Sequence, residues 1–154
     1  MNIDPWSLSW SARGLLAWEK SRRTGVERSR RTGVFVSDSR GGGRRRILSA
    51  PGPSRLPRWS YDGSKLSYVC RDVLCGTRPD GSARRVLSPR CDMTEDLAGM
   101  AWSPGGRQIA CVGRLGNLMT LRLDTGRSQI LRRPTSRGVG YLPVEITWRP
   151  RPTR

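Results

Sequence analysis

The feature that most constrains the fold is a motif that recurs along the chain. It consists of a tryptophan, a glycine-containing turn and an apolar stretch, and it is clearest in PRWSYDGSKLSYV (57–69) and MAWSPGGRQIACV (100–112). A weaker copy, LSWSARGLLAWE, spans 8–19, and ITWRP (146–150) repeats only the opening. The repeat tryptophans are Trp10, Trp59, Trp102 and Trp148, at intervals of 49, 43 and 46 residues. A period in this range indicates a repeat architecture.

Each full copy continues with a second hairpin, in 33–49, 72–88 and 116–132. Aspartate favours the turns because its side chain bonds the backbone ahead, and glycine because it accepts positive φ. The turn residues of the second and third copies are Asp62, Gly63, Asp80, Gly81, Gly106, Asp124 and Gly126. We therefore expect four short antiparallel strands per unit, which in the second unit are 55–59, 65–70, 73–78 and 84–87. Four such strands every 40 to 50 residues are typical of a β-propeller blade.

The predicted fold is all-β: three blades of four antiparallel strands plus one leading strand, an incomplete ring. No helix of ordinary length is expected. The propeller spans 5–150, and its parts are a first blade over 5–49 with an inserted basic loop at 20–32, a second blade over 54–88, a third over 97–132, the leading strand of a fourth at 144–148, and a tail at 151–154.

The strings WSYDGSKLSYV and WSPGGRQIACV, followed by RPDGSARRVLS and RLDTGRSQILR respectively, resemble the TolB-like family of WD-related propeller repeats. That pattern runs Trp-Ser-Pro-Asp-Gly, an aliphatic strand, and then a strand ending in an Asp-Gly or Thr-Gly turn. The first copy departs from it at Ala12-Arg13, and the third has Gly105 in place of aspartate. The resemblance covers about 5–150 and implies a noncatalytic scaffold that binds proteins or peptides. It also implies relatives that are exported to the bacterial envelope.

A chain with three blades is too short to close a propeller ring by itself. Propellers usually hold four to eight blades, so three units make about half of a ring. An open stack leaves two sheet faces and several strand edges uncovered. Three explanations fit: a fragment of a longer propeller, which we favour; two copies that pair into a six-bladed ring; or a degraded reading frame.

The net charge of the chain is +17, from 29 basic and 12 acidic residues. Such a charge favours an anionic partner, namely nucleic acid, a membrane surface or an acidic protein. An arginine-biased proteome would raise the arginine content equally without any selection for binding. The stretch 20–46 alone carries a net +8.

The basic insertion repeats SRRTGV at 21–26 and 29–34. A tandem duplication explains it, since surface loops accept insertions at little cost; an arginine-rich binding arm is the alternative. Flexible arginine-rich segments bind phosphates through charge, but Phe35 is the only aromatic residue nearby. Nucleic-acid binding is therefore the alternative to protein binding, and its candidate residues are Arg22, Arg23, Arg28, Arg30, Arg31, Arg44, Arg45 and Arg46.

The repeat tryptophans are expected to be apolar anchors that pack one blade on the next. Trp18 aligns with Tyr68 and is expected in the core too. A ligand-binding aromatic cage is the alternative reading of these side chains.

Neither catalysis nor a metal or other cofactor is expected. The chain has no histidine, which excludes Ser-His-Asp and Cys-His pairs and any histidine ligand. Its cysteines form no CxxC pair, which argues against zinc. Asp92, Glu95 and Asp96 could attract a cation, but a solvated acidic loop is the favoured reading.

Cys70 and Cys75 could face each other across a tight hairpin at a bondable distance. The first twenty residues contain Asp4 and no uninterrupted apolar run, so neither a signal peptide nor a membrane span is expected. The sequence as written therefore predicts a cytoplasmic protein, with a periplasmic or exported location if the start is misassigned. For a cytoplasmic protein, two reduced cysteines are favoured over a disulfide.

Overall fold

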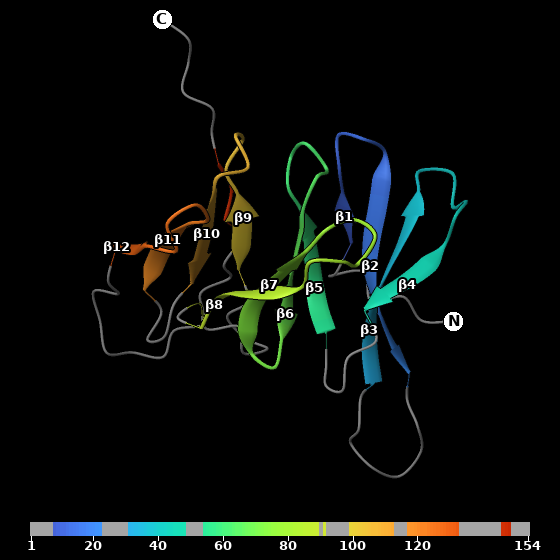
Figure 1. Ribbon diagram of the computed structural model, residues 1–154, viewed down its shortest axis with the longest axis horizontal. Helices are drawn as coiled ribbons and strands as arrows, with labels where there is room; N and C mark the ends of the chain where they lie inside the picture. Colours follow the sequence, from blue (N-terminus) through green and yellow to red (C-terminus); the bar gives the residue numbers. More distant parts are fainter. Residues whose placement is uncertain are drawn as a thin grey trace, which may run out of the picture.

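The computed structural model describes residues 8–22, 31–48, 54–89, 91, 99–112, 117–132 and 146–148, and the structural statements below refer to these. Within them, the chain forms three antiparallel four-stranded sheets and no helix. The sheets lie side by side along the long axis of the molecule, in chain order (Figure 1). This arrangement confirms the predicted fold class.

The strands follow one another in space in the order of the sequence within every sheet. The first sheet contains β1 (Ser9–Trp10), β2 (Leu15–Arg22), β3 (Arg31–Asp38) and β4 (Arg45–Leu48). The second contains β5 (Ser54–Trp59), β6 (Leu66–Cys70), β7 (Val73–Thr77) and β8 (Arg85–Ser88). The third contains β9 (Met100–Trp102), β10 (Gln108–Val112), β11 (Leu118–Arg122) and β12 (Ser128–Arg132).

The serine that follows each repeat tryptophan builds the first turn of its sheet. The hydroxyls of Ser11, Ser60 and Ser103 accept the backbone N–H of Leu15, Lys65 and Gln108, at 3.1, 2.9 and 3.0 Å respectively. The turns point to the same end of the molecule (Figure 1). Each tryptophan of these three sheets is consequently the last residue of its first strand.

Asp62 strengthens the turn of the second sheet. Its carboxylate accepts the hydroxyl of Ser64 at 2.7 Å, the hydroxyl of Ser60 at 2.7 Å and the backbone N–H of Ser64 at 3.1 Å. These hydrogen bonds, those of Ser64 and then Ser60 first, lower the pKa of Asp62 from 3.8 to about 2. Gly63 beside it has φ +65°, which the turn requires.

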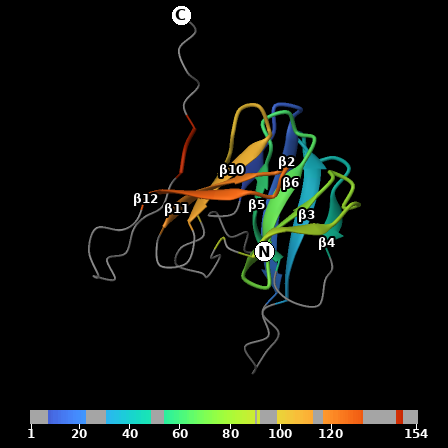
Figure 2. The same cartoon turned by 60° about the vertical axis from the view of Figure 1, so that its left-hand side comes forward.

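Two apolar clusters join the sheets. The first lies between the first and second sheets, and its centre includes Val34, Val36, Leu66 and Tyr68. The second lies between the second and third sheets. Only the second sheet is therefore packed against another described sheet on both of its faces. Figure 2 shows the same sheets turned by 60°.

The loop between the last two strands has the same conformation in the first and second sheets. Gly41 and Gly81 have φ of +81° and +86°, and Gly43 and Ala83 have φ of +59° and +53°. In the second sheet this loop touches the first sheet: a Cβ on Gly81 would lie 2.7 Å from the carbonyl oxygen of Ile47. A Cβ on Gly41 would have nothing within 4 Å.

Two segments differ from the sequence prediction. Part of the expected loop at 20–32 is strand, because β2 and β3 extend through the pairs Lys20↔Gly33 and Arg22↔Arg31; residues 23–30 lie outside the described residues. The strand expected at 144–148 is not formed in 146–148, the only part of it that the structure describes.

Gly81→Ala and Gly41→Ala form a matched pair of variants that measures the contact between the first two sheets. Both place a side chain at strongly positive φ, which costs about 1–2 kcal/mol. Only Gly81→Ala also forces a methyl group against a backbone carbonyl, which we expect to cost about 1–3 kcal/mol more. Urea unfolding of the two variants measures the difference; equal losses would show that the sheets separate easily at this point.

The carboxylate of Asp62 should make stability depend on acid. Because its folded-state pKa is lowered from 3.8 to about 2, its contribution is present above about pH 4 and is lost as the pH falls toward 2. Asp62→Asn should therefore melt below the wild-type chain at pH 5, and the gap should close on acidification. A gap in melting temperature that stays constant from pH 5 to pH 2 would contradict this.

Candidate binding surface

Each sheet presents one face to the sheet before it, here called the leading face, and the other to the sheet after it, the trailing face. In the second sheet the leading face is formed by Trp59, Leu66, Tyr68 and Cys75, which pack on the first sheet. In the third sheet the corresponding cross-strand pairs are Ile109↔Trp102 and Cys111↔Met119. Ile109, Cys111 and Met119 belong to the cluster between the second and third sheets, so this face of the third sheet packs on the sheet before it as that of the second sheet does.

The leading face of the first sheet has no described sheet before it. The pairs Trp10↔Leu16 and Trp18↔Phe35 occupy the positions of Trp59↔Leu66 and Tyr68↔Cys75. Trp10 is 63% exposed, whereas Trp59 is 6% exposed. The role of Trp10 as an anchor between two sheets is thus not fulfilled within the described residues, whereas Trp18 is buried, as expected for a core residue.

Two cations lie over the aromatic pair of this face. The rings of Trp18 and Phe35 are stacked with 6.0 Å between their centroids. The guanidinium carbon of Arg44 lies 5.6 Å from the Trp18 centroid and 5.5 Å from the Phe35 centroid, and the Lys20 ammonium lies 6.0 Å from Phe35. At exposed sites such cation–π contacts contribute about 0.5–1 kcal/mol each.

The corresponding arginine of the second sheet has a different role. Arg84 follows its loop as Arg44 follows the loop of the first sheet, and its guanidinium donates to the carbonyl of Ile47 at 2.7 Å. It thereby crosses to the last strand of the preceding sheet. Arg44, with no described sheet to reach, lies on the rings of its own leading face.

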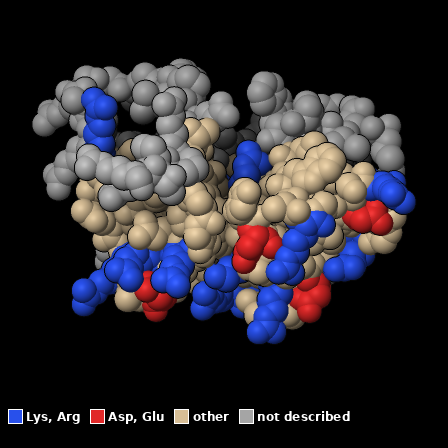
Figure 3. All heavy atoms as spheres, turned by 90° about the horizontal axis from the view of Figure 1, so that it is seen from above, with Lys and Arg blue, Asp and Glu red and all other residues tan. Residues whose placement is uncertain are grey.

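The structure places the candidate anion-binding arginines in different settings. Arg44, Arg45 and Arg46 are exposed, and Arg45 donates to the carbonyl of Pro79 at 3.3 Å. Arg22 and Arg31 pair at the ends of β2 and β3, where only the backbone is described. Arg23, Arg28 and Arg30 lie outside the described residues. Seen from above, basic side chains gather along one long side of the molecule with carboxylates between them (Figure 3).

Trp148 covers part of the trailing face of the third sheet. Its indole N–H donates to the carbonyl of Ala101 at 3.0 Å. The indole of Trp102 donates in the same way to the carbonyl of Arg58, also at 3.0 Å. Both carbonyls belong to the residue just before a repeat tryptophan, so Trp148 sits on the third sheet as Trp102 sits on the second.

Two grooves lie at equivalent positions on the trailing faces of the second and third sheets. One, of about 360 Å³, lies between the second and third sheets and is lined by Lys65, Leu87 and Trp102 among others. The other, of about 470 Å³, lies on the trailing face of the third sheet and is lined by the equivalent residues Gln108, Leu131 and Trp148. The first is bounded by Leu123 of the next sheet, and no described sheet bounds the second.

Arg122, on the second groove, is held by an ion pair. Its guanidinium donates to both oxygens of Asp124, at 3.2 and 2.7 Å. The hydrogen bond from Arg122 is the main reason why the pKa of Asp124 is lowered from 3.8 to about 2. The charge of Arg122 is therefore compensated locally.

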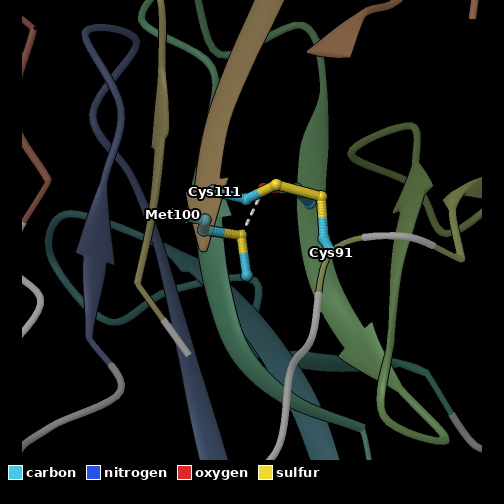
Figure 4. The surroundings of a disulfide bond; sticks show 4 residues. Cys91, Met100 and Cys111 are labelled. Atoms are coloured by element: carbon cyan, nitrogen blue, oxygen red, sulfur yellow. Dashed lines mark hydrogen bonds between the residues drawn. A yellow bond between two sulfur atoms is a disulfide. The ribbon is translucent and has the colours of Figure 1, made fainter. Parts of the chain in front are cut away.

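The cysteines are paired. Cys70 and Cys75 form a disulfide between β6 and β7 with 5.9 Å between their Cα atoms, so the expectation of reduced cysteines is wrong. A second disulfide joins Cys91 to Cys111, 20 residues apart, beside Met100 (Figure 4). Its only signal in the sequence is an even number of cysteines, from which the partners cannot be deduced.

The part of the chain that the structure describes contains no cluster of side chains suited to bind a metal ion. No three potential metal-ligating side chains meet there, and Asp92, Glu95 and Asp96 lie outside the described residues. No helix of the described ranges is long and apolar enough to cross a membrane.

Comparison with known proteins gives matches among solved structures only. No family model and no curated protein sequence matches the chain. TolB from Acinetobacter baumannii is 18% identical with a TM-score of 0.64, over 86% of this chain and 33% of that one. A nidogen/laminin complex is 15% identical with a TM-score of 0.59, over 83% and 48%. Acylaminoacyl peptidase from Pyrococcus horikoshii is 10% identical with a TM-score of 0.60, over 81% and 23%.

The chain therefore spans less than half the length of each of these three structures. At such identities the likeness concerns the fold alone.

A double-mutant cycle tests the indole contact between the second and third sheets. The indole of Trp102 also donates to the hydroxyl of Ser67 at 2.9 Å, so Trp102→Phe and Ser67→Ala should be coupled by about 1 kcal/mol. The buried indole nitrogen of Trp59 has no hydrogen-bond partner among the described residues. Trp59→Phe with Ser67→Ala should thus be additive in urea unfolding, and similar coupling in both cycles would contradict the assignment.

Proposed function

Because the chain has a TolB-like β-propeller fold, we propose that it is a noncatalytic scaffold that binds a protein through the leading face of its first sheet. One observation carries this proposal. Trp10 is 63% exposed at the position where Trp59 of the next sheet is 6% exposed. The face is thus built like the surface that joins sheets inside the molecule, but it is uncovered by any described sheet.

The composition of this face suits protein recognition. Tryptophan is enriched in the residues that dominate binding energy at protein interfaces, and exposed apolar patches commonly mark interaction sites. Leu8, two residues before Trp10, is 54% exposed. Arg44 and Lys20 supply a polar rim beside the Trp18–Phe35 pair.

The absence of catalysis rests on the available side chains. The chain contains no histidine, and the recurrent serines are used in turns: the Ser60 hydroxyl donates to Asp62 at 2.7 Å and accepts from the Lys65 backbone at 2.9 Å. Of the similar structures, the nidogen/laminin complex is a protein–protein assembly, which agrees with a binding role for this fold.

The two disulfides favour an oxidising compartment, since paired cysteines persist mainly outside the cytoplasm. A periplasmic or exported location fits them better than the cytoplasmic one that the start of the sequence predicts.

Phosphate binding by the basic segment is the second candidate function, because Arg44, Arg45 and Arg46 are adjacent and exposed. The carboxylates that lie among the basic side chains weaken it (Figure 3). Binding of this kind would fall steeply with salt, whereas apolar binding at the leading face would not.

Site-specific photo-crosslinking in the producing cells tests the proposed function. A photoreactive side chain in place of Trp10 should give protein adducts, and the same group in place of Val86, which is 58% exposed on the second sheet, should give few. Excess unlabelled chain should suppress the adduct, whereas excess Trp10→Ala should not. Equal labelling from both positions, or none from position 10, would refute the proposal.

A further inference from the structure

We infer that the partner of this leading face is a second copy of the chain, which receives it on the trailing face of its own third sheet, so that two copies close one ring of six sheets. The inference rests on the proposed function and names its partner. It is argued from two contacts inside the molecule that the outer faces are able to repeat: the loop contact between the first and second sheets and the tryptophan contact between the second and third.

The trailing face of the third sheet has the residues that would accept these contacts from the second copy. The last strand of every sheet has a bulge at the same register, which leaves Ile47, Leu87 and Leu131 between paired neighbours. Ile47 is 4% exposed because the second sheet covers it, whereas Leu131 is 54% exposed. Leu131 also lines the groove of about 470 Å³ that no described sheet bounds.

The leading face of the first sheet has the loop that would make these contacts. Loop 38–44 repeats loop 78–84 in conformation, with Gly41 in the place of Gly81 and Arg44 in the place of Arg84. In the second sheet, Gly81 approaches the Ile47 carbonyl and Arg84 donates to it at 2.7 Å. On docking, Arg44 leaves the aromatic rings and donates to the Leu131 carbonyl of the second copy, with Gly41 against the same oxygen.

The position that Trp10 needs is held by Trp148. At the junction of the second and third sheets, the Trp102 indole donates to the Arg58 carbonyl at 3.0 Å. In the same way the Trp10 indole of one copy would donate to the Ala101 carbonyl of the other, and that carbonyl already accepts the Trp148 indole at 3.0 Å. The described residues around Trp148, 146–148, form no strand. Trp148 therefore competes for this position as a tethered segment of its own chain, and docking requires its release.

Charge sets the salt dependence of docking. Each copy carries a net +17. Of these charges, those of Arg44 and Lys20 lie on the leading face, whereas Arg122 on the trailing face is paired with Asp124. Two such copies repel, and salt screens exposed charges over about 8 Å at physiological strength. Association should strengthen as salt rises, which is opposite to binding of a nucleic acid.

The inferred assembly is a closed ring rather than an open filament. A contact between two different faces makes rings when the rotation closes, and six sheets fall within the usual four to eight blades of a propeller. The two faces lie at opposite ends of the row of sheets (Figure 1), so each copy can give one and receive one. A dimer satisfies both.

Analytical ultracentrifugation of the full chain, over a range of concentrations and at low and high salt, tests the inference. The wild-type chain should pass from 17.2 kDa to twice that mass as concentration and salt rise. Trp148→Ala should lower the dissociation constant at least tenfold, because it frees the Ala101 carbonyl. Trp10→Ala and Arg44→Met should each raise it at least tenfold.

Two glycines of one loop provide the matched control. Gly41 and Gly43 both have positive φ, and a Cβ on either would meet nothing within 4 Å in the single chain. Gly41→Ala should weaken the dimer at least tenfold, because its methyl group would meet the carbonyl of Leu131 in the other copy. Gly43→Ala should not, since the second sheet has Ala83 at this position with φ +53°. Circular dichroism checks that both variants fold.

The outcomes separate this inference from the proposed function. Three results would overturn the inference. The Trp148→Ala variant could stay monomeric at high salt, Gly41→Ala could leave the dissociation constant of the dimer unchanged, or the chain could form larger open assemblies. Crosslinks from position 10 should map around Ala101 of a differently tagged copy. Adducts only with other proteins would overturn the inference and leave the proposed function standing, whereas no adducts at all would refute both.

Discussion

The structure depends on one requirement: a four-stranded sheet with apolar side chains on both faces must be covered on both sides. Within the described residues only the second sheet meets it, through the clusters around Tyr68 and around Ile109. Burial of apolar area stabilises by roughly 25 cal/mol per Å², so an uncovered face forgoes stabilisation comparable to a large part of the stability of a small domain. The binding role assigned to the outer faces follows from this deficit.

One loop conformation makes different contacts in the first and second sheets, because only the second has a described sheet before it. Loops 38–44 and 78–84 share their backbone conformation, yet Arg84 reaches a carbonyl of the preceding sheet and Arg44 lies over Trp18 and Phe35. A cation on an aromatic face is a modest substitute for a hydrogen bond across a buried interface. The difference lies in the surroundings of the two loops.

The disulfides and the net charge have opposite effects on the stability of the fold. The disulfides tie β6 to β7 and the segment at Cys91 to β10, which limits the unfolded state more than the folded one. The net charge of +17 instead opposes compaction and association through repulsion. The apolar faces and the disulfides must together outweigh that repulsion.

The sequence alone determined the repeat, the strands and the turns. These depend on local rules: the period of the tryptophans and the aspartate- and glycine-containing turns, such as the one at Gly63. They placed the strands of the second sheet within about a residue of their observed bounds. The tertiary structure decided which faces are covered and how the cysteines pair. It also decided that the indole of Trp59 finds no partner among the described residues while that of Trp102 has two, and that Trp148 donates to the Ala101 carbonyl. Those features depend on residues far apart in the chain meeting in space. The tryptophan of each repeat has a similar local sequence whether or not another sheet lies against it.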